Sequence, residues 1–426
     1  MSLFSMRKNE LEEEKRRLLD EYNKFKEKNL KLDMSRGKPS KEQVELSSSM
    51  LDIINSKSVC ETREGVDCRN YGLLDGIMEI RELFAEIMQV SPEQVFVGGN
   101  SSLNMMFDTI SCYMTHGVCE NEPWIKQGDV KFLCPVPGYD RHFSILEYFG
   151  IGMITVPMTD NGPDMDIVEK LVSTDDTIKG IWCVPKYSNP EGITYSDDTV
   201  RRFAKLRPAA SDFRIFWDNA YAIHGITDKP DILLNLMDEC VKEGNEDLPI
   251  IFCSTSKVTF PGSGVAAMAA SLENMKEIRR RYSFQTIGFD KINQLRHIYF
   301  FKNYSGVLRH MQKHKNILKP KFDIVINYLN NELADYGVAK WKVPNGGYFI
   351  SVDVTDGCAN RVVELCKDAG VILTPAGATY PYKNDPYDRN IRIAPTYPPE
   401  SELKSAMELF CICVKLASIE KQLNKN

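Results

Sequence analysis

Hydrophobic residues recur at helical spacing in the charged segment from about residue 8 to residue 30. The residues that form this pattern are Leu11, Leu18, Leu19, Tyr22 and Phe25. Such spacing predicts an amphipathic helix. In the following segment, residues 32–40, Gly37 and Pro39 interrupt both the helical and the strand period, so we expect an irregular loop there.

From about residue 70 onward, short apolar runs alternate with amphipathic segments. The runs typical of strands cover residues 94–97, 130–134, 151–157, 178–184, 213–217 and 249–253. Helical patterns cover residues 74–89, 102–116, 164–173 and 196–206. Strands that alternate with helices predict a mostly parallel sheet covered on both faces. Ligands of such sheets bind at the carboxyl ends of the strands.

A second pattern begins at about residue 290. A long helical stretch is expected over 290–331, and a smaller α/β unit over 340–426, with a strand at 348–354 and a helix at 359–369. The chain has 426 residues, which is long enough for two or three domains.

Composition excludes several classes of protein. Hydrophobic residues are 43% of the chain and charged residues 26%, as in ordinary globular proteins. Against 59 acidic residues there are 53 basic ones, a formal net charge of −6, which gives no sign of nucleic-acid binding. No apolar stretch approaches the roughly 18–20 residues needed to cross a bilayer.

The cysteines and the first residues bear on location and on metals. The charged N-terminal segment predicts neither a signal peptide nor a transit peptide. Twelve cysteines are scattered without a Cys-x-x-Cys pair, so we expect reduced thiols and a cytoplasmic location. His310 and His314 are one helical turn apart, but no acidic ligand accompanies them, and no metal site is predicted.

Lys257 follows the apolar run 248–253 and precedes a glycine turn. A lysine just past a buried strand suits Schiff-base chemistry with a carbonyl cofactor, since desolvation lowers the pKa of an amine. Taken alone, a lysine in this place is more often a solvated surface group.

Other polar elements also follow predicted strands, and each has a simpler explanation. Gly98–Ser102 could bind phosphate at a helix N-terminus or be only an N-cap. Tyr139, on a Pro-Gly turn, could stack on an aromatic ring, and Asn189 in Asn-Pro-Glu-Gly could donate to a phenolate oxygen; both segments could also be ordinary turns.

Two further elements carry charge. Asp218 ends an aromatic strand, where an acid needs a cation unless it is exposed, and a protonated pyridine nitrogen would serve; Tyr221 is three residues on. Arg392 lies in a short apolar strand and needs a carboxylate partner, either from a substrate or from within the chain.

The order of these motifs resembles the pyridoxal-phosphate enzymes of fold type I, the class I/II aminotransferases. Segments 35–40 and 254–262 are similar to the aspartate aminotransferase branch related to the aminotransferase half of MocR regulators. The resemblance implies a large, mostly parallel-sheet α/β domain and a smaller α/β domain built from the N- and C-terminal segments. We expect residues 1–60 to contribute to the small domain, 61–310 to form the cofactor-binding domain and 311–426 to complete the small domain.

The resemblance also implies roles for individual residues. Lys257 would hold pyridoxal 5'-phosphate as a Schiff base, Asp218 would pair with the pyridinium nitrogen, and Tyr139 would stack on the ring. Asn189 and Tyr221 would bond its phenolic oxygen, and Arg392 would bind the substrate α-carboxylate, with Gly37 close by. The phosphate would be bound by Ser101, Ser102, Ser254, Ser256 and, from the neighbouring subunit of a homodimer, Tyr71.

One loop departs from the family pattern. Most members of the family that this chain resembles follow the lysine with Pro-Gly-x-Arg-x-Gly, whose arginine binds the phosphate, whereas this chain has Pro-Gly-Ser-Gly-Val at 261–265. Hydroxyls, backbone amides or another cation must neutralise the phosphate instead.

Three functions compete at this point. The first is an aminotransferase with a ping-pong mechanism. Its expected amino donor is L-aspartate, and its expected amino acceptor is the 2-oxo acid 2-oxoglutarate. A dicarboxylate then needs a second cation, for which the candidates are Arg36, Lys186, Lys291 and Arg296. The second is a pyridoxal-phosphate lyase or decarboxylase, which would use the same Schiff base. The third is a ligand sensor, which the short segment before Gly37 disfavours because it leaves no room for a DNA-binding module.

Overall fold

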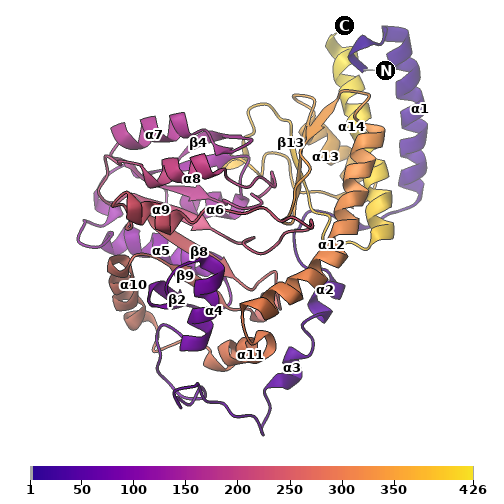
Figure 1. Cartoon of the computed structure of the whole chain (residues 1–426). Helices are drawn as coiled ribbons and strands as arrows, with labels where there is room; N and C mark the ends of the chain where they lie inside the picture. The colour runs from indigo at the N-terminus through magenta and orange to yellow at the C-terminus, as the bar shows by residue number, and fades with distance from the viewer. Residues whose placement is uncertain (1–2, 426) are drawn as a thin grey trace.

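The computed structural model describes residues 3–425, and its centre is an eight-stranded mixed sheet (Figure 1). The strand order is β2-β9-β8-β7-β6-β3-β4-β5. The parallel strands are β3 (Lys131–Val136), β4 (Gly152–Thr159), β6 (Ile178–Cys183), β7 (Arg214–Asp218) and β8 (Pro249–Ser254). Antiparallel pairings add β2 (Val95–Val97), β9 (Ala266–Ala269) and β5 (Gly162–Pro163) at the edges. The predicted α/β fold with a mostly parallel sheet is confirmed.

Helices cover both faces of this sheet because alternate strand residues point to opposite sides. In β7, Phe216 packs into a core with α5 (Ser102–His116), α6 (Asp140–Tyr148) and α10 (Leu272–Gln285). Its neighbours Ile215 and Trp217 pack into the core on the other face. That face is covered by α4 (Met78–Met88), α7 (Met165–Thr174), α8 (Asp197–Ala204), α9 (Leu236–Lys242) and α11 (Lys291–Phe301).

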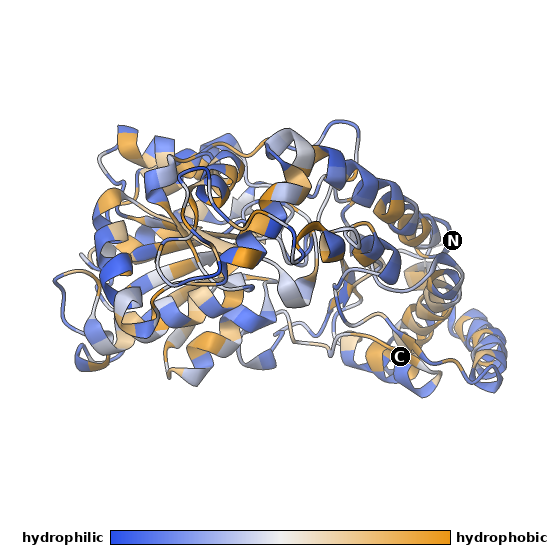
Figure 2. Cartoon of the chain, turned by 90° about the horizontal axis from the view of Figure 1, so that it is seen from below, coloured by the Kyte–Doolittle hydropathy of each residue, from blue (hydrophilic) through white to orange (hydrophobic). Residues whose placement is uncertain are grey.

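The two ends of the chain share a separate core. Helix α1 (Lys8–Glu27) packs against α14 (Glu400–Lys425), and β1 (Leu32–Asp33) pairs with β12 (Val371–Ile372). A three-stranded antiparallel sheet and one further helix complete this unit: β10 (Ala339–Trp341), β11 (Ile350–Val354), β13 (Asn390–Ile393) and α13 (Ala359–Asp368). Figure 2 shows both hydrophobic and hydrophilic residues along the helices near the two termini.

Helix α12 (Tyr304–Glu332) joins the two units. Val307 and Met311 pack into the core of the large sheet, whereas Leu318 and Phe322 pack into the core of the terminal unit. Short helices α2 (Lys41–Glu45) and α3 (Met50–Ile53) lie along α12 and α11. The core to which α12 contributes thus changes after Met311, and the division into 1–60, 61–310 and 311–426 stays a prediction.

The chain differs from the sequence-based expectation at several places. Leu32 and Asp33, at the start of the segment expected to be an irregular loop, form β1 and pair with β12. The stretch 290–331 is two helices, because Lys302 has a left-handed φ of 68° and Asn303 then caps α12 by accepting from the Gly306 N–H. Strand β9 was not predicted, since its Ala-Ala-Met-Ala sequence has weak strand propensity. Among residues 3–425, no helix is long and apolar enough to cross a membrane.

Candidate active site

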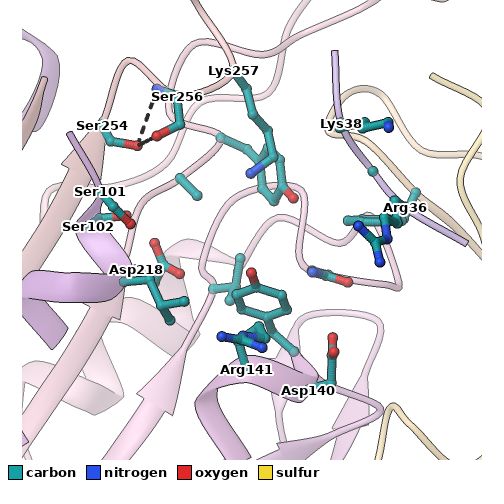
Figure 3. Close-up of a pocket in the computed structure, with 18 of the residues that line it drawn as sticks. Arg36, Lys38, Ser101, Ser102, Asp140, Arg141, Asp218, Ser254, Ser256 and Lys257 are labelled. Atoms are coloured by element: carbon teal, nitrogen blue, oxygen red, sulfur yellow. Dashed lines mark hydrogen bonds between the residues drawn. The ribbon is translucent and has the colours of Figure 1, made fainter. Parts of the chain in front are cut away.

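A cavity of about 390 Å³ lies at the carboxyl ends of β6, β7 and β8 (Figure 3). The terminal unit contributes Gly37 and Arg392 to its wall. The structure brings together nearly every residue that the sequence suggested: Gly37, Ser101, Ser102, Tyr139, Asn189, Asp218, Tyr221, Ser254, Ser256, Lys257 and Arg392. A cavity of this size is typical of a small-molecule site. Tyr71 is the exception, since 80% of it is exposed outside this cavity.

Lys257 projects into the middle of the cavity (Figure 3). Its Nζ lies 5.0 Å from the centre of the Tyr221 ring and 5.7 Å from that of Tyr348. Burial lowers the pKa of this amine, and the charge of Asp218 opposes that shift. The lowered pKa makes a free, nucleophilic amine more available near neutral pH.

Buried polar contacts fix the loop that carries Lys257. The Thr255 hydroxyl accepts from the Val265 N–H at 2.9 Å, which joins the loop to the start of β9. His297, on α11, is fully buried, with Nδ1 2.7 Å from the Asn293 carbonyl and Nε2 3.0 Å from the Thr259 hydroxyl. A carbonyl only accepts, so Nδ1 carries the proton and Nε2 accepts from Thr259 in the neutral ring.

This histidine should make the protein less stable in mild acid. Burial lowers the pKa of His297 to about 4, whereas an unfolded histidine titrates near about 6.5. Between these values the unfolded chain binds a proton that the folded state excludes. The free energy of unfolding should therefore fall by up to about 1.4 kcal/mol per pH unit as pH drops from about 6.5 to about 4.

Urea denaturation at a series of pH values tests this expectation. His297→Gln should show a shallower loss of stability over the same range, while the exposed control His116→Gln should keep the wild-type slope. Equal slopes for wild type and His297→Gln would show that His297 does not contribute.

Asp218 ends β7 and is 4% exposed. Its Oδ2 lies 3.0 Å from His142 Nε2, and the His142 ring stacks on Trp182 at 4.3 Å. Its Oδ1 is buried and has no hydrogen-bond partner among the described residues. Because an unpaired buried carboxylate oxygen is costly, this atom is suited to a cationic or N–H group of a ligand in the cavity.

Tyr139, Tyr221 and Asn189 lie around the centre of the same cavity. Burial raises the pKa of Tyr139 to about 12 and that of Tyr221 well above its ordinary value. Both phenols therefore remain protonated and able to donate. The Asn189 Oδ1 accepts from Arg392 Nη1 at 3.2 Å, which leaves the amide N–H₂ of Asn189 as a donor toward the ligand.

Four serines gather at one end of the cavity (Figure 3). Ser101 is the N-cap residue of α5, but its side chain makes no capping hydrogen bond. Ser254 Oγ donates to Ser256 Oγ at 3.0 Å and accepts from the Ser256 N–H at 3.4 Å. Hydroxyls beside the N-terminus of a 15-residue helix are suited to an anion such as a phosphate.

Arg392 lines the same cavity and is 7% exposed. Its guanidinium lies 4.7 Å over the Phe349 ring, and its Nη1 donates to Asp140 Oδ1 at 2.9 Å. A Cβ on Gly37 would come within 2.2 Å of the Phe349 ring, so only glycine allows the backbone to approach here. The intramolecular partner that the sequence left open for Arg392 is Asp140.

Of the four candidates for the cation that binds a second carboxylate, one lines the cavity and three lie outside its lining. Arg36 lines the cavity. Lys186 donates to the Ala222 carbonyl, Lys291 to the Gly72 carbonyl, and Arg296 to Ser263 and Asn293, all outside the lining of this cavity. Lys291 therefore holds the loop next to Tyr71.

Several residues of the site were missed by sequence reasoning. Lys38, Asp140, Arg141 and Phe349 line the cavity, and His142 contacts Asp218 from outside the lining. His142 follows Tyr139 by three residues at the start of a helix, and a buried acid such as Asp218 calls for a partner. That signal could have found His142. Nothing comparable marked Lys38, whose Nζ lies 3.9 Å over the Tyr397 ring.

The chemistry of these side chains fits pyridoxal phosphate. Lys257 supplies an amine for its aldehyde, the free Oδ1 of Asp218 suits its ring nitrogen, and the four serines suit its phosphate. Together with the sheet order, this arrangement defines a fold type I transferase.

Comparisons with known proteins agree with this class. The profile of the family described as aspartate amino-transferase matches residues 6–426. The aspartate aminotransferase of Corynebacterium glutamicum is 46% identical over 404 residues, 95% of this chain and 93% of that protein. The crystal structure of an aspartate transaminase from the same species is 45% identical and covers 99% of both chains with a TM-score of 0.96.

A more distant relative is a transcriptional regulator. The HTH-type transcriptional regulator NorG of Staphylococcus aureus is 22% identical over 287 residues, 66% of this chain and 60% of that protein. The chain belongs to the aspartate aminotransferase family, and it is an aminotransferase that moves an amino group from an amino acid to a 2-oxo acid.

Proposed function

We propose that this enzyme binds pyridoxal 5'-phosphate at Lys257 and transfers the amino group of L-aspartate to 2-oxoglutarate. The observation that carries the proposal is the pairing of a buried amine with a buried, half-satisfied carboxylate across one cavity. When bound, the cofactor supplies an aldehyde that links to amines and a ring that accepts electron density from the substrate Cα.

Each residue then has a defined task in the ping-pong reaction. Lys257 would serve as base and then acid for the proton at the substrate Cα. Asp218, oriented by His142, keeps the ring nitrogen protonated where negative charge develops. Arg392 binds the α-carboxylate, while Tyr221 and Asn189 donate hydrogen bonds to the phenolic oxygen.

The charge of the cavity supports a dicarboxylic substrate. Five basic side chains line it, against the acids Asp140 and Asp218: Arg36, Lys38, Arg141, Lys257 and Arg392. Arg36 and Arg141 are exposed on the cavity wall and have no ion pair among the described residues. We propose that Arg36 is the cation that binds the side-chain carboxylate of a dicarboxylic substrate.

Single-turnover spectra with a panel of amino acids test this proposal. L-aspartate should convert the enzyme to the pyridoxamine form, without 2-oxo acid present, far more efficiently than L-alanine or L-asparagine. Arg36→Ala should lower kcat/KM for aspartate by about 10- to 100-fold, the loss of one charged hydrogen bond. Its effect on alanine should be small.

The surface variant Arg201→Ala is the matched control, since Arg201 pairs only with acids on the outer face of α8 and α9. An equal loss of kcat/KM for aspartate and for alanine in Arg36→Ala would show that Arg36 does not bind the substrate side chain. Release of ammonia or CO₂ in place of the pyridoxamine form would indicate a lyase or decarboxylase.

We also propose a homodimer in which Tyr71 reaches the phosphate of the neighbouring subunit. Large hydrophobic side chains are exposed around its loop and on the nearby segment before α11: Tyr71 80%, Leu73 37%, Phe284 82% and Ile287 61%. The Gly72 carbonyl accepts from Lys291 at 2.9 Å, which ties the two segments together. Exposed apolar side chains gathered in this way are typical of an interface between subunits.

A cytoplasmic location stays a prediction. All twelve cysteines are free thiols, and burial raises the pKa of Cys134 and Cys183 far above the ordinary range. Such thiols behave as small apolar side chains and suit a reducing compartment.

A further inference from the structure

The carboxylate site at Arg392 already contains a carboxylate of the protein itself. Asp140 Oδ1 lies 2.9 Å from Arg392 Nη1, and both side chains line the substrate cavity. The two partners differ in burial: 7% of the Arg392 side chain is exposed, against 35% of Asp140. Asp140 therefore sits on the open side of the pair, at the first residue of α6.

The side-chain hydrogen bonds of Arg392 use only one of its terminal nitrogens. Among the described residues, Nη1 donates to both Asp140 and Asn189, whereas Nη2 makes no side-chain hydrogen bond. A guanidinium can hold a carboxylate through two parallel N–H groups. The single contact from Asp140 is thus weaker than the bidentate pair that an incoming carboxylate can form.

Asp140 is also not needed to hold Arg392 in place. The guanidinium lies over the Phe349 ring at 4.7 Å, and this ring is in turn packed against the backbone of Gly37. Asn189 provides a further acceptor at 3.2 Å. These contacts come from the Phe349 ring and from Asn189, and neither of them involves Asp140.

We propose that Asp140 is a displaceable occupant of the α-carboxylate site: it neutralises buried Arg392 in the free enzyme and gives way to the carboxylate of the substrate. The proposal rests on the proposed role of Arg392. Its physical basis is that a buried, unpaired guanidinium is costly, whereas a half-exposed acid at a helix N-terminus is readily released and remains favourably placed beside the helix dipole. Asp140 thus selects for ligands that bind Arg392 better than it does.

The test is the affinity of the cofactor-loaded enzyme for succinate, a dicarboxylate without an amino group to transfer. Asp140→Asn keeps the shape of the side chain but removes its charge, so it competes less for Arg392. Titration calorimetry should show that the variant binds succinate about three- to tenfold more tightly than wild type does. This factor corresponds to the free energy of a partly exposed ion pair. The KM for L-aspartate should fall by a similar factor.

Two controls isolate the competition. Asp197→Asn removes a surface charge that pairs with Arg201 and should leave the Kd unchanged. Arg392→Ala should weaken succinate binding at least about tenfold, and in that background Asp140→Asn should no longer tighten it. Asp140→Ala serves as the second variant if the amide variant folds poorly.

Each other outcome has a separate meaning. Weaker or unchanged binding in Asp140→Asn overturns the proposal, because Asp140 would then position Arg392 or play no part. Equal tightening in the presence and absence of Arg392 also overturns it, since the effect would be one of general charge. Wild-type binding by Arg392→Ala would instead refute the proposed carboxylate site itself.

Discussion

Replacing Lys257 with alanine should abolish transamination and covalent attachment of the cofactor. The amine has two proposed tasks, to link the cofactor and to move the proton at the substrate Cα. Among the described residues that line the cavity, the other lysine is Lys38, which lies away from the serines (Figure 3). Loss of the proton-transfer role alone costs roughly 10²–10⁴-fold in rate. We expect the variant to fall at least at the upper end of this range.

Borohydride reduction followed by peptide mass spectrometry measures the attachment directly. Wild type should be tagged at residue 257, and the variant should carry no tag. Lys257→Arg keeps a positive charge but supplies no nucleophilic amine near neutral pH, so it should behave like the alanine variant. The exposed control Lys276→Ala should retain both tag and turnover. A tag on Lys38, or turnover without Lys257, would refute the assignment.

Replacing Asp218 with asparagine should produce the second large effect. The amide cannot hold a proton on the ring nitrogen, so the ring stabilises the developing charge less well. Loss of one preorganised electrostatic contact at the reacting centre costs about 10²–10³-fold in kcat. Binding of the cofactor should survive, because Lys257 and the serines remain.

The measurement is kcat for L-aspartate together with the amount of bound cofactor. Asp197→Asn, an exposed acid on α8, is the control for a change of one charge. His142→Gln should give a smaller loss, because the histidine contacts only Oδ2 and acts by orienting the carboxylate. Wild-type kcat in Asp218→Asn would show that the aspartate does not support the ring nitrogen.

The cavity was predicted well where its residues directly follow strands. Ser254, Lys257 and Asp218 come at the ends of β7 and β8, and parallel strands bring their carboxyl ends to one edge of the sheet. Alternation of apolar runs and helical segments was therefore enough to place these side chains together. The same reasoning could not place Arg392 against Asp140, because 252 residues separate them and their contact depends on how the terminal unit packs on the sheet.

By itself, the sequence determined the mostly parallel α/β sheet and the residue types that fit the proposed pyridoxal phosphate site. These follow from local periodicity and from polar residues at strand ends, which are short-range properties of the chain. Only the tertiary structure decided that Arg36, Lys38 and Arg141 line the cavity while Lys186, Lys291 and Arg296 bind backbone or loop oxygens elsewhere. The tertiary structure also decided that His142 contacts the carboxylate of Asp218 and that Asp140 forms an ion pair with Arg392. Such pairings depend on the directions in which distant segments pack, and no local pattern encodes those directions.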